Sequence, residues 1–273
     1  MIWGFDTSVP SVARVYDVLL GGKDNFEADR VAAAKIVEIA PTAMIEASEN
    51  RAFLARAVNW LATEAGIRQF LDIGSGLPAR DNTHEVAQRA AEGTSVMYVD
   101  ADRVVVTHAR ALMANEGLGC LNSVHVAEAN MLDPAEIIRQ AQDILDLTQP
   151  VAILLVAILH FISDADDPWG IVKALMAAVP PGSYLVISHA MVDDNPSSVA
   201  AVAALRKLYA QTAAGGLTPR TRDSVLRFLD DGMEIVEPGL VDVAGWHQEQ
   251  RWVETHFLGG IARKRTVRGD EPA

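Results

Sequence analysis

Short β-rich runs alternate with longer helical patterns from residue 69 onward, and this alternation constrains the fold more than any other feature. It is typical of a parallel sheet with crossover helices on both faces, so the chain is predicted to adopt an α/β fold. The predicted strands are Gln69–Ile73, Val96–Asp100, Ser123–Glu128, Val151–Val156, Ser183–Ser188, Met233–Glu237 and His256–Arg263. The predicted helices between them are Thr83–Ala91, Ala101–Asn115, Pro134–Leu145, Pro168–Val179, Ser197–Gln211 and Thr221–Leu229.

The apolar run from Val151 to Leu159 indicates where the centre of the sheet lies. It has no polar face, as expected for a parallel strand that is covered on both sides. A buried helical segment is the alternative interpretation.

Residues 1–62 carry no strand signal. They are predicted to form helices, broken at Gly21-Gly22 and at Pro41, that lie ahead of the sheet and cap it. We therefore divide the chain into a helical cap, residues 1–62, and a sheet domain, residues 63–273.

The charge balance argues against nucleic acid as a partner. Aspartate and glutamate total 36 and lysine and arginine total 23, which gives a net charge of −13. Nucleic-acid-binding domains usually carry a basic patch, so no nucleic-acid partner is expected.

Cysteine content and hydropathy indicate a reducing, aqueous setting. Cys120 is the only cysteine, which excludes internal disulfides and zinc sites built from several cysteines, and we predict no metal site. The first residues lack the basic and apolar regions of a secretory signal. The run Val151–Leu159 is far shorter than the ~20 residues that a membrane helix needs. We expect a cytoplasmic protein with no membrane partner.

The sharpest local feature is the segment Phe70 to Pro78, where an apolar strand runs into a tight glycine turn. Glycine at positions 74 and 76 lets the backbone approach a ligand closely, and free N–H groups in such a turn suit a carboxylate or a phosphate. Asp72, at the end of the strand, is placed to accept hydrogen bonds from an ammonium group. Asp100 ends the next strand, where a carboxylate binds the two hydroxyls of a ribose.

Two ligands fit this pattern. Residues 74–79 satisfy the dinucleotide motif G-x-G-x-x-[GA], but Pro78 disturbs the turn and the next helix is predicted to begin only near Thr83. The other ligand is S-adenosylmethionine, whose carboxylate would meet the glycine turn and whose ammonium would meet Asp72. A glycine turn with no ligand is the third interpretation.

Distinctive motifs are spread over nearly the whole chain: Ala13–Phe26, Gly76-Leu77-Pro78, Asn82–Val86, Tyr98-Val99-Asp100, Asp133-Pro134, Leu154–Ala157 with His160, and Pro238–Val241. Together they resemble an actinobacterial family of S-adenosylmethionine-dependent methyltransferases. The resemblance implies a class I, Rossmann-like fold with a seven-stranded, mostly parallel sheet, in which the last strand is antiparallel and inserted beside its neighbours. It also implies S-adenosylmethionine as cofactor and S-adenosylhomocysteine as product.

The same resemblance assigns roles to residues at the ends of the first four strands. The turn Gly74-Ser75-Gly76 would hold the methionine part of the donor, with Asp72 and Ala157 beside it, and Asp100 would hold the ribose. Ala101 and Met131 would lie on either side of the adenine. Asn130 would face the adenine amino group, at a position where an acidic residue is expected, and its amide oxygen can accept the same hydrogen bond.

Further candidates lie in the cap and after the fourth strand. Tyr16, Gly22 and Asn25 are predicted to form a lid over the donor or the acceptor, and a helix–turn–helix that merely covers the sheet is the alternative. His160 is a candidate general base near the transferred methyl group, with a structural histidine as the alternative, and Tyr16 is the second catalytic candidate.

The sequence therefore predicts methyl transfer from S-adenosylmethionine to an unidentified acceptor. The segment Ala157 to His160 lacks the Asn/Asp-Pro-Pro-aromatic motif of enzymes that methylate DNA or release factors, which argues against those acceptors. The apolar cap and the net negative charge favour a small-molecule acceptor. Two alternatives stay open: an NAD(P)-dependent oxidoreductase, and a non-catalytic sensor that binds S-adenosylmethionine.

Overall fold

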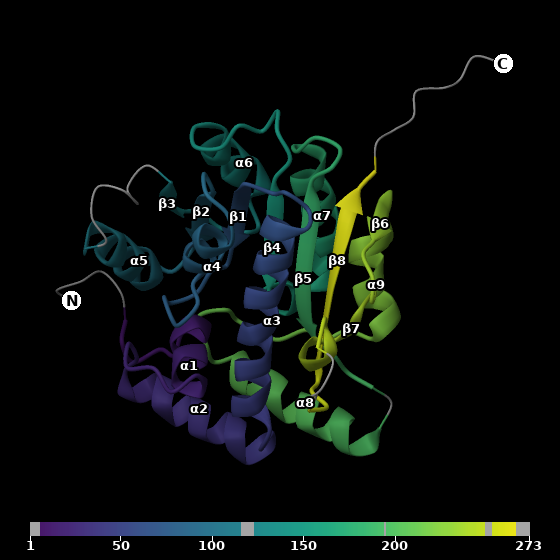
Figure 1. The fold of residues 1–273 in the computed structure, drawn as a ribbon. Helices are drawn as coiled ribbons and strands as arrows, with labels where there is room; N and C mark the ends of the chain where they lie inside the picture. The colour runs from purple at the N-terminus through teal and green to yellow at the C-terminus, as the bar shows by residue number, and fades with distance from the viewer. Residues whose placement is uncertain (1–5, 116–122, 194, 249–252, 266–273) are drawn as a thin grey trace.

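A single mixed sheet organises the computed structural model, which describes residues 6–115, 123–193, 195–248 and 253–265 (Figure 1). The strand order is β3-β2-β1-β4-β5-β8-β6, and β7 pairs with β8. Strands β1 to β5 are parallel, whereas β8 runs antiparallel to β5, β6 and β7. The strands are β1 (Gln69–Ile73), β2 (Ser95–Asp100), β3 (Val124–Glu128), β4 (Ala152–Val156), β5 (Tyr184–Ala190), β6 (Met233–Ile235), β7 (Val241–Asp242) and β8 (Phe257–Lys264).

This topology confirms the predicted fold class and the inserted antiparallel strand. The sheet has eight strands within the described residues, one more than predicted, because the two-residue β7 adds to the edge of β8. The apolar run that begins at Val151 forms the central strand β4, which confirms the strand interpretation.

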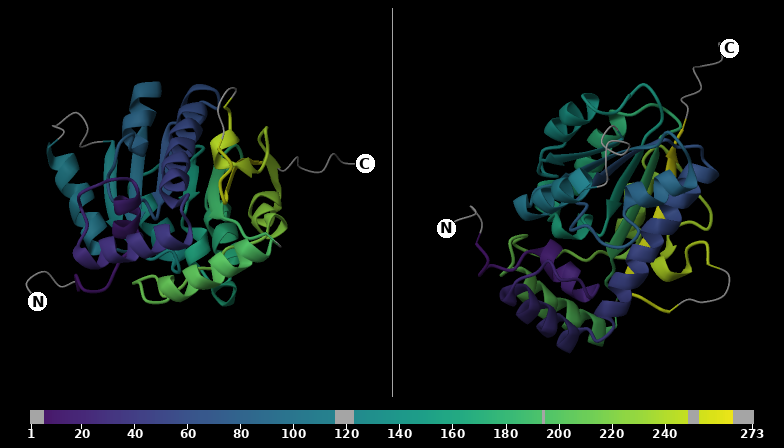
Figure 2. Two further views of the ribbon diagram at one scale, coloured as in Figure 1. Left: turned by 90° about the horizontal axis from the view of Figure 1, so that it is seen from below. Right: turned by 60° about the vertical axis from the view of Figure 1, so that its left-hand side comes forward.

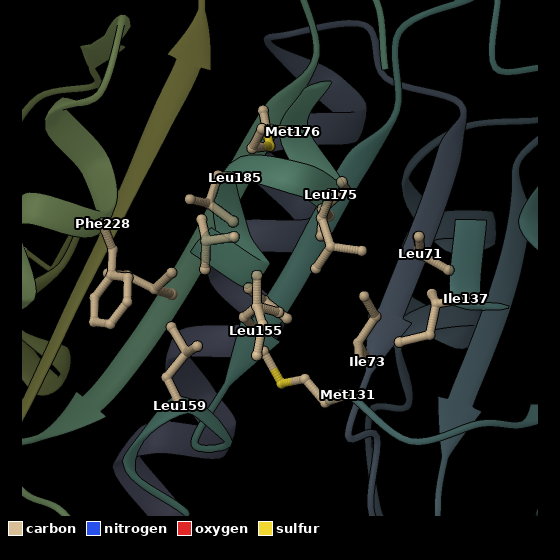
Figure 3. Packing of buried hydrophobic residues seen from close by; sticks show 14 of the residues in the cluster. Leu71, Ile73, Met131, Ile137, Leu155, Leu159, Leu175, Met176, Leu185 and Phe228 are labelled. Carbon is tan, nitrogen blue, oxygen red and sulfur yellow. The ribbon is translucent and has the colours of Figure 1, made fainter. Parts of the chain in front are cut away.

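Helices cover both faces of the sheet (Figure 1). Successive residues of a strand point to opposite faces, so Leu154 packs beneath α3 and α4 while Leu155 packs beneath α6 and α7. Figure 3 shows the hydrophobic core on the side of α6 and α7, which contains Leu155 and also Phe228 of α9. The helices are α1 (Val12–Leu19), α2 (Glu27–Ile39), α3 (Ala43–Thr63), α4 (Thr83–Ala90), α5 (Arg103–Asn115), α6 (Pro134–Gln142), α7 (Pro168–Ala177), α8 (Pro196–Tyr209) and α9 (Arg222–Asp230).

A third layer lies beyond the carboxyl ends of the parallel strands. Helices α1, α2 and α8 gather there (Figures 1 and 2) and share a small core with the start of α3. Helix α3 continues from this layer onto the sheet, where Phe53 and Leu61 are fully buried. The predicted boundary between residues 62 and 63 falls in the last turn of α3 and stays a prediction.

Hydrogen bonds set the start of two helices near the sheet edge. Helix α4 begins at Thr83, as predicted, and the N–H of Asn82 donates to the carboxylate of Glu85 at 2.7 Å. Helix α5 begins at Arg103 rather than at Ala101, because Asp102 precedes it and accepts the N–H of Val104 at 2.9 Å.

None of the helices in the described ranges combines the length and the apolar composition that crossing a membrane requires.

Candidate functional site

The strand order reverses between β1 and β4, and a crevice lies there at the carboxyl ends of the strands. The glycine turn follows β1 on one side of this crevice. Gly74 has φ 71° and Gly76 has φ 68°, which favours glycine at both positions. A Cβ on Gly74 would lie 2.6 Å from Cγ1 of Ile158, so the turn packs directly against the loop after β4. Apart from its chain neighbours, no atom of the described residues lies within 4 Å of the corresponding point on Gly76, which leaves that position open to a ligand.

A cavity of about 210 Å³ extends from this turn to the helical layer. It brings together most of the predicted site residues, namely Tyr16, Asp72, Gly74, Ser75, Gly76, Asp100, Ala157 and His160. Gly22, Asn25, Ala101, Asn130 and Met131 do not line it.

Asp100 holds the turn in shape. Its Oδ2 accepts the N–H of Gly76 at 2.9 Å, and its Oδ1 accepts the N–H of Asp102 at 2.9 Å. Each oxygen has a further lone pair, so the carboxylate is able to accept hydroxyl hydrogen bonds from the cavity as well. Burial raises the pKa of Asp100 above its ordinary value.

Asp72 is buried at the end of β1, where its Oδ2 accepts a hydrogen bond from the hydroxyl of Thr83 at 2.6 Å. Burial raises the pKa of Asp72 to about 6, although Thr83 and the nearby Arg51 oppose the shift. A buried carboxylate without a bound cation is costly, so this position favours a ligand with a positive charge.

Arg51, on α3, is a site residue that the sequence analysis missed. It lines the cavity, and its guanidinium donates to the carbonyl of Arg80 at 3.2 Å and to Oδ1 of Asn82 at 3.0 Å. These bonds fix an arginine beside the glycine turn, on the same side as Asp72. An α-amino acid group would find its two complementary charges in Arg51 and Asp72.

A chain of hydrogen bonds connects the helical layer to the sheet. The hydroxyl of Tyr16 donates to the carbonyl of Ala47 and accepts from Nδ2 of Asn50, both at 2.9 Å. Oδ1 of Asn50 accepts from the hydroxyl of Ser188, which accepts the N–H of Ala157 at 2.9 Å. Tyr16 thus anchors α1 to α3 and β5, and burial raises its pKa.

The start of α1 is attached to the turn that follows β2 and Asp100. Arg14 pairs with Asp29 at 2.8 Å, and both side chains are almost fully buried. Asp29 also accepts the N–H groups of Ser11 and Phe26. The hydroxyl of Ser11 donates to Asp102 at 2.6 Å, which ties α1 to the turn after β2.

His160 lines the cavity where the loop after β4 meets the end of β5. Its Nδ1 accepts the N–H of Ala190 at 3.3 Å, so the proton of the neutral ring lies on Nε2. Burial lowers the pKa of His160 well below its ordinary value, and His189 and Arg220 add to the shift. The ring is therefore neutral and presents an N–H donor, whereas a general base at Nε2 would need the other tautomer.

Gly22 and Asn25 belong to the turn between α1 and α2. The carboxylate of Asp17 accepts from Nδ2 of Asn25 at 2.8 Å and from the N–H of Asp24 at 3.0 Å. A Cβ on Gly22 would lie 1.9 Å from this carboxylate, which explains the glycine sterically. The geometry places both residues in a turn outside the cavity, and their role at the donor stays a prediction.

The predicted adenine contacts lie at the ends of β2 and β3. Ala101 is exposed, Met131 is buried in the core shown in Figure 3, and Asn130 is exposed with its Oδ1 accepting the N–H of Leu132 at 2.9 Å. Their backbone is held next to Asp100, whose carbonyl accepts the N–H of Ala129 at 3.1 Å. Their contact with an adenine stays a prediction.

Other residues that the sequence analysis missed lie on α3. Glu46, Asn50 and Arg51 line the cavity among the apolar residues Ala43, Ala47 and Leu54. Polar residues at helical spacing within an apolar stripe are the signal that could have identified them.

Comparisons with known proteins agree with this geometry. A family model described as S-adenosyl methyltransferase matches residues 3–265. A candidate methyltransferase from Thermobifida fusca is 40% identical, over 96% of this chain and 97% of its own, with a TM-score of 0.85. A DUF574 family protein from Streptomyces avermitilis is 40% identical, over 95% of this chain and 99% of its own, also with a TM-score of 0.85.

A more distant solved structure shares the fold. An O-methyltransferase family 2 protein from Planctomyces limnophilus, in complex with apigenin, is 14% identical over 92% of this chain and 65% of its own, with a TM-score of 0.51. No curated protein matches the chain.

The strand order, the glycine turn at the reversal point and the acidic residue that ends β2 define a class I methyltransferase. Because the family model covers most of the chain, the protein belongs to the S-adenosyl methyltransferase family. It is accordingly an enzyme whose cofactor is S-adenosylmethionine. The start of α4 agrees with this assignment, since α4 begins at Thr83, after the glycine turn, whereas in a dinucleotide fold the helix begins inside the glycine motif.

Proposed function

We propose that the enzyme methylates a small molecule that binds between the sheet edge and the helices α1, α2, α3 and α8. The observation that carries this proposal is the continuity of the cavity, which joins the glycine turn to an apolar chamber under those helices. The walls of this chamber are Leu19, Ile36, Ala40, Ala43, Phe161, Leu205, Leu217 and Phe257. The P. limnophilus protein, which shares the fold, is solved with the small molecule apigenin, and this agrees with the proposal.

The residues of the crevice fit the donor. Asp100 would accept from the ribose hydroxyls, Asp72 from the ammonium, and Arg51 would donate to the carboxylate. Gly74, Ser75, Gly76 and Ala157 would supply the backbone against the methionine part, and Ala101, Asn130 and Met131 the adenine contacts. Tyr16, Gly22 and Asn25 would act through the lid that residues 1–62 provide.

S-adenosylmethionine supplies a methyl group that is already activated by its positively charged sulfur. The protein therefore has to position the acceptor and to exclude water, more than it has to supply an acid and a base. The buried ion pair Arg14–Asp29 holds α1 against α2, and the partly buried hydrogen bond from Ser11 to Asp102 holds it against the turn after β2. Tyr16 fixes the same helix to α3 through Ala47 and Asn50.

His160 and Tyr16 are the polar groups that we place next to the acceptor. The hydroxyl of Tyr16 is already engaged as donor and as acceptor, so its contribution is to shape and position the site. His160 would donate from Nε2 to an oxygen or nitrogen of the acceptor.

Incubation with methyl-labelled S-adenosylmethionine tests the proposal. Fractionated small-molecule extracts, DNA, RNA and proteins are offered separately, and S-adenosylhomocysteine is quantified in each. We expect label and S-adenosylhomocysteine to appear together in a small-molecule fraction. Label only in a macromolecule contradicts the small-molecule acceptor, and donor binding without turnover in any fraction favours the sensor.

A further inference from the structure

Glu46 places a carboxylate in the apolar chamber. It lies on α3, one helical turn before Asn50, and it lines the cavity although only 7% of its surface is exposed. Burial alone would raise the pKa of Glu46, but hydrogen bonds from His256 and Thr42 outweigh burial and lower it. Glu46 is therefore ionised at neutral pH.

The two oxygens of Glu46 differ in their contacts. Oε1 accepts from the hydroxyl of Thr42 at 3.0 Å, from the N–H of His256 at 3.3 Å and from Nδ1 of His256 at 2.8 Å. Within the part of the chain that the structure describes, Oε2 accepts no hydrogen bond. Because Glu46 lines the cavity, Oε2 keeps its lone pairs for a hydrogen-bond donor of a ligand.

The other groups around the chamber do not compensate this charge fully. Among the described residues, Arg51 is the sole lysine or arginine in the lining, and it lies at the glycine turn. His160 is neutral, and burial raises the pKa of Tyr209, so both stay uncharged at neutral pH. His256 pairs with Oε1 at 2.8 Å, and this hydrogen bond raises the pKa of His256, but its side chain is 56% exposed to solvent, where water screens its charge. The chamber thus combines apolar walls with one negative group.

Glu46 lies beyond the end of the sheet. Its partner His256 precedes β8, and Phe257, the first residue of β8, pairs with Ala190, the last residue of β5. Asn50, by contrast, reaches Ser188 within β5. A ligand group at Glu46 is therefore an anchor on the far side of the chamber from the glycine turn.

We propose that the acceptor is an apolar molecule with a basic amine, and that this amine binds Oε2 of Glu46. The inference rests on the proposed function, because it assumes that the acceptor occupies the chamber. A carboxylate accepts from an ammonium through a charge-assisted hydrogen bond and repels an anion of the same shape. Glu46 is in this view a specificity-determining residue.

Binding measurements test the anchor without a known acceptor. Isothermal titration calorimetry is run on the full chain saturated with S-adenosylhomocysteine. The probes are phenylalkyl amines with linkers of two to four carbons, and the alcohols and carboxylates of matching length. We expect the best amine to bind at least tenfold more tightly than its alcohol. Glu46→Gln should abolish this preference, whereas Glu49→Gln, one turn further along α3 and outside the cavity lining, should preserve it.

Each contrary outcome has a distinct meaning. Alcohols or carboxylates that bind as well as amines, an amine preference that survives Glu46→Gln, or no binding of any amine overturns the inference. If Glu46→Gln fails to fold, the comparison of amine with alcohol in the wild-type protein still decides. Absence of S-adenosylhomocysteine binding contradicts the proposed function itself, whereas its binding without any amine binding contradicts only the role of Glu46.

Discussion

Truncating Asp100 should weaken donor binding much more than it weakens the fold. Its carboxylate accepts two backbone N–H groups, those of Gly76 and Asp102, each at 2.9 Å. In Asp100→Ala these N–H groups face a cavity that water can enter, so the free energy of unfolding should fall by about 1–3 kcal/mol. The variant should remain folded, because this loss is well below the stability of an ordinary domain.

The loss of donor affinity follows from the ribose contacts that the carboxylate would make. Hydrogen bonds to a charged group contribute about 1.5–3 kcal/mol, which corresponds to a roughly 10- to 150-fold rise in Kd. Isothermal titration calorimetry with S-adenosylhomocysteine measures the change. Glu128→Ala is the matched control, since Glu128 ends the neighbouring strand β3 with an exposed carboxylate outside the cavity. An unchanged Kd in folded Asp100→Ala, or an equal loss in Glu128→Ala, would refute the placement of the ribose.

Three further predictions address the fold, the pH dependence and the donor carboxylate. Arg14→Leu leaves the buried Asp29 without its cation and should lower the free energy of unfolding by about 3–5 kcal/mol in urea denaturation; a loss below about 1 kcal/mol would show that the ion pair does not hold the helical layer. The pKa of Asp72 is raised to about 6 in the folded protein, because burial disfavours its charged form. The folded protein is therefore most stable while Asp72 is protonated, below about pH 4, and it loses this stability as pH rises through 6. Asp72→Asn should accordingly be more stable than the free wild-type protein at pH 7.5, by up to about 3 kcal/mol, with the difference vanishing toward pH 4; a difference independent of pH contradicts the shift. Arg51→Met should raise the Kd for S-adenosylhomocysteine about 10- to 100-fold and leave the Kd for methylthioadenosine, which lacks the carboxylate, unchanged; equal losses for both ligands would exclude a contact with the carboxylate.

Local patterns were sufficient to predict the sheet and its glycine turn. Apolar runs and turn residues depend on near neighbours in the chain, so Gln69–Ile73 and the central β4 were found from the sequence. The predicted start of α5, at Ala101, was wrong by two residues, because the side chain of Asp102 accepts the N–H of Val104 and the helix begins only at Arg103. Such capping depends on one hydrogen bond that hydropathy does not register.

The polar residues of α3 could not be predicted from local patterns. Glu46, Asn50 and Arg51 each meet a partner more than twenty residues away in the chain. Glu46 contacts His256 next to β8, Asn50 contacts Ser188 on β5, and Arg51 contacts Asn82 just before α4. Their role depends on how α3 crosses from the helical layer onto the sheet. Gly22 and Asn25 stand in a distinctive sequence block, and their local contacts are with the carboxylate of Asp17 in the turn between α1 and α2. Their predicted role at the donor stays a prediction.

Thermal unfolding of the dialysed protein with four ligands in parallel tests the central claim most directly. The ligands are S-adenosylmethionine, S-adenosylhomocysteine, NAD and NADP, each at about 100 times the Kd expected for a cofactor. A ligand at that concentration adds about 2.7 kcal/mol to the free energy of unfolding. The structure predicts a higher melting temperature with both S-adenosyl compounds and an unchanged one with both dinucleotides. Stabilisation by NAD or NADP alone would contradict the assignment of the crevice to S-adenosylmethionine.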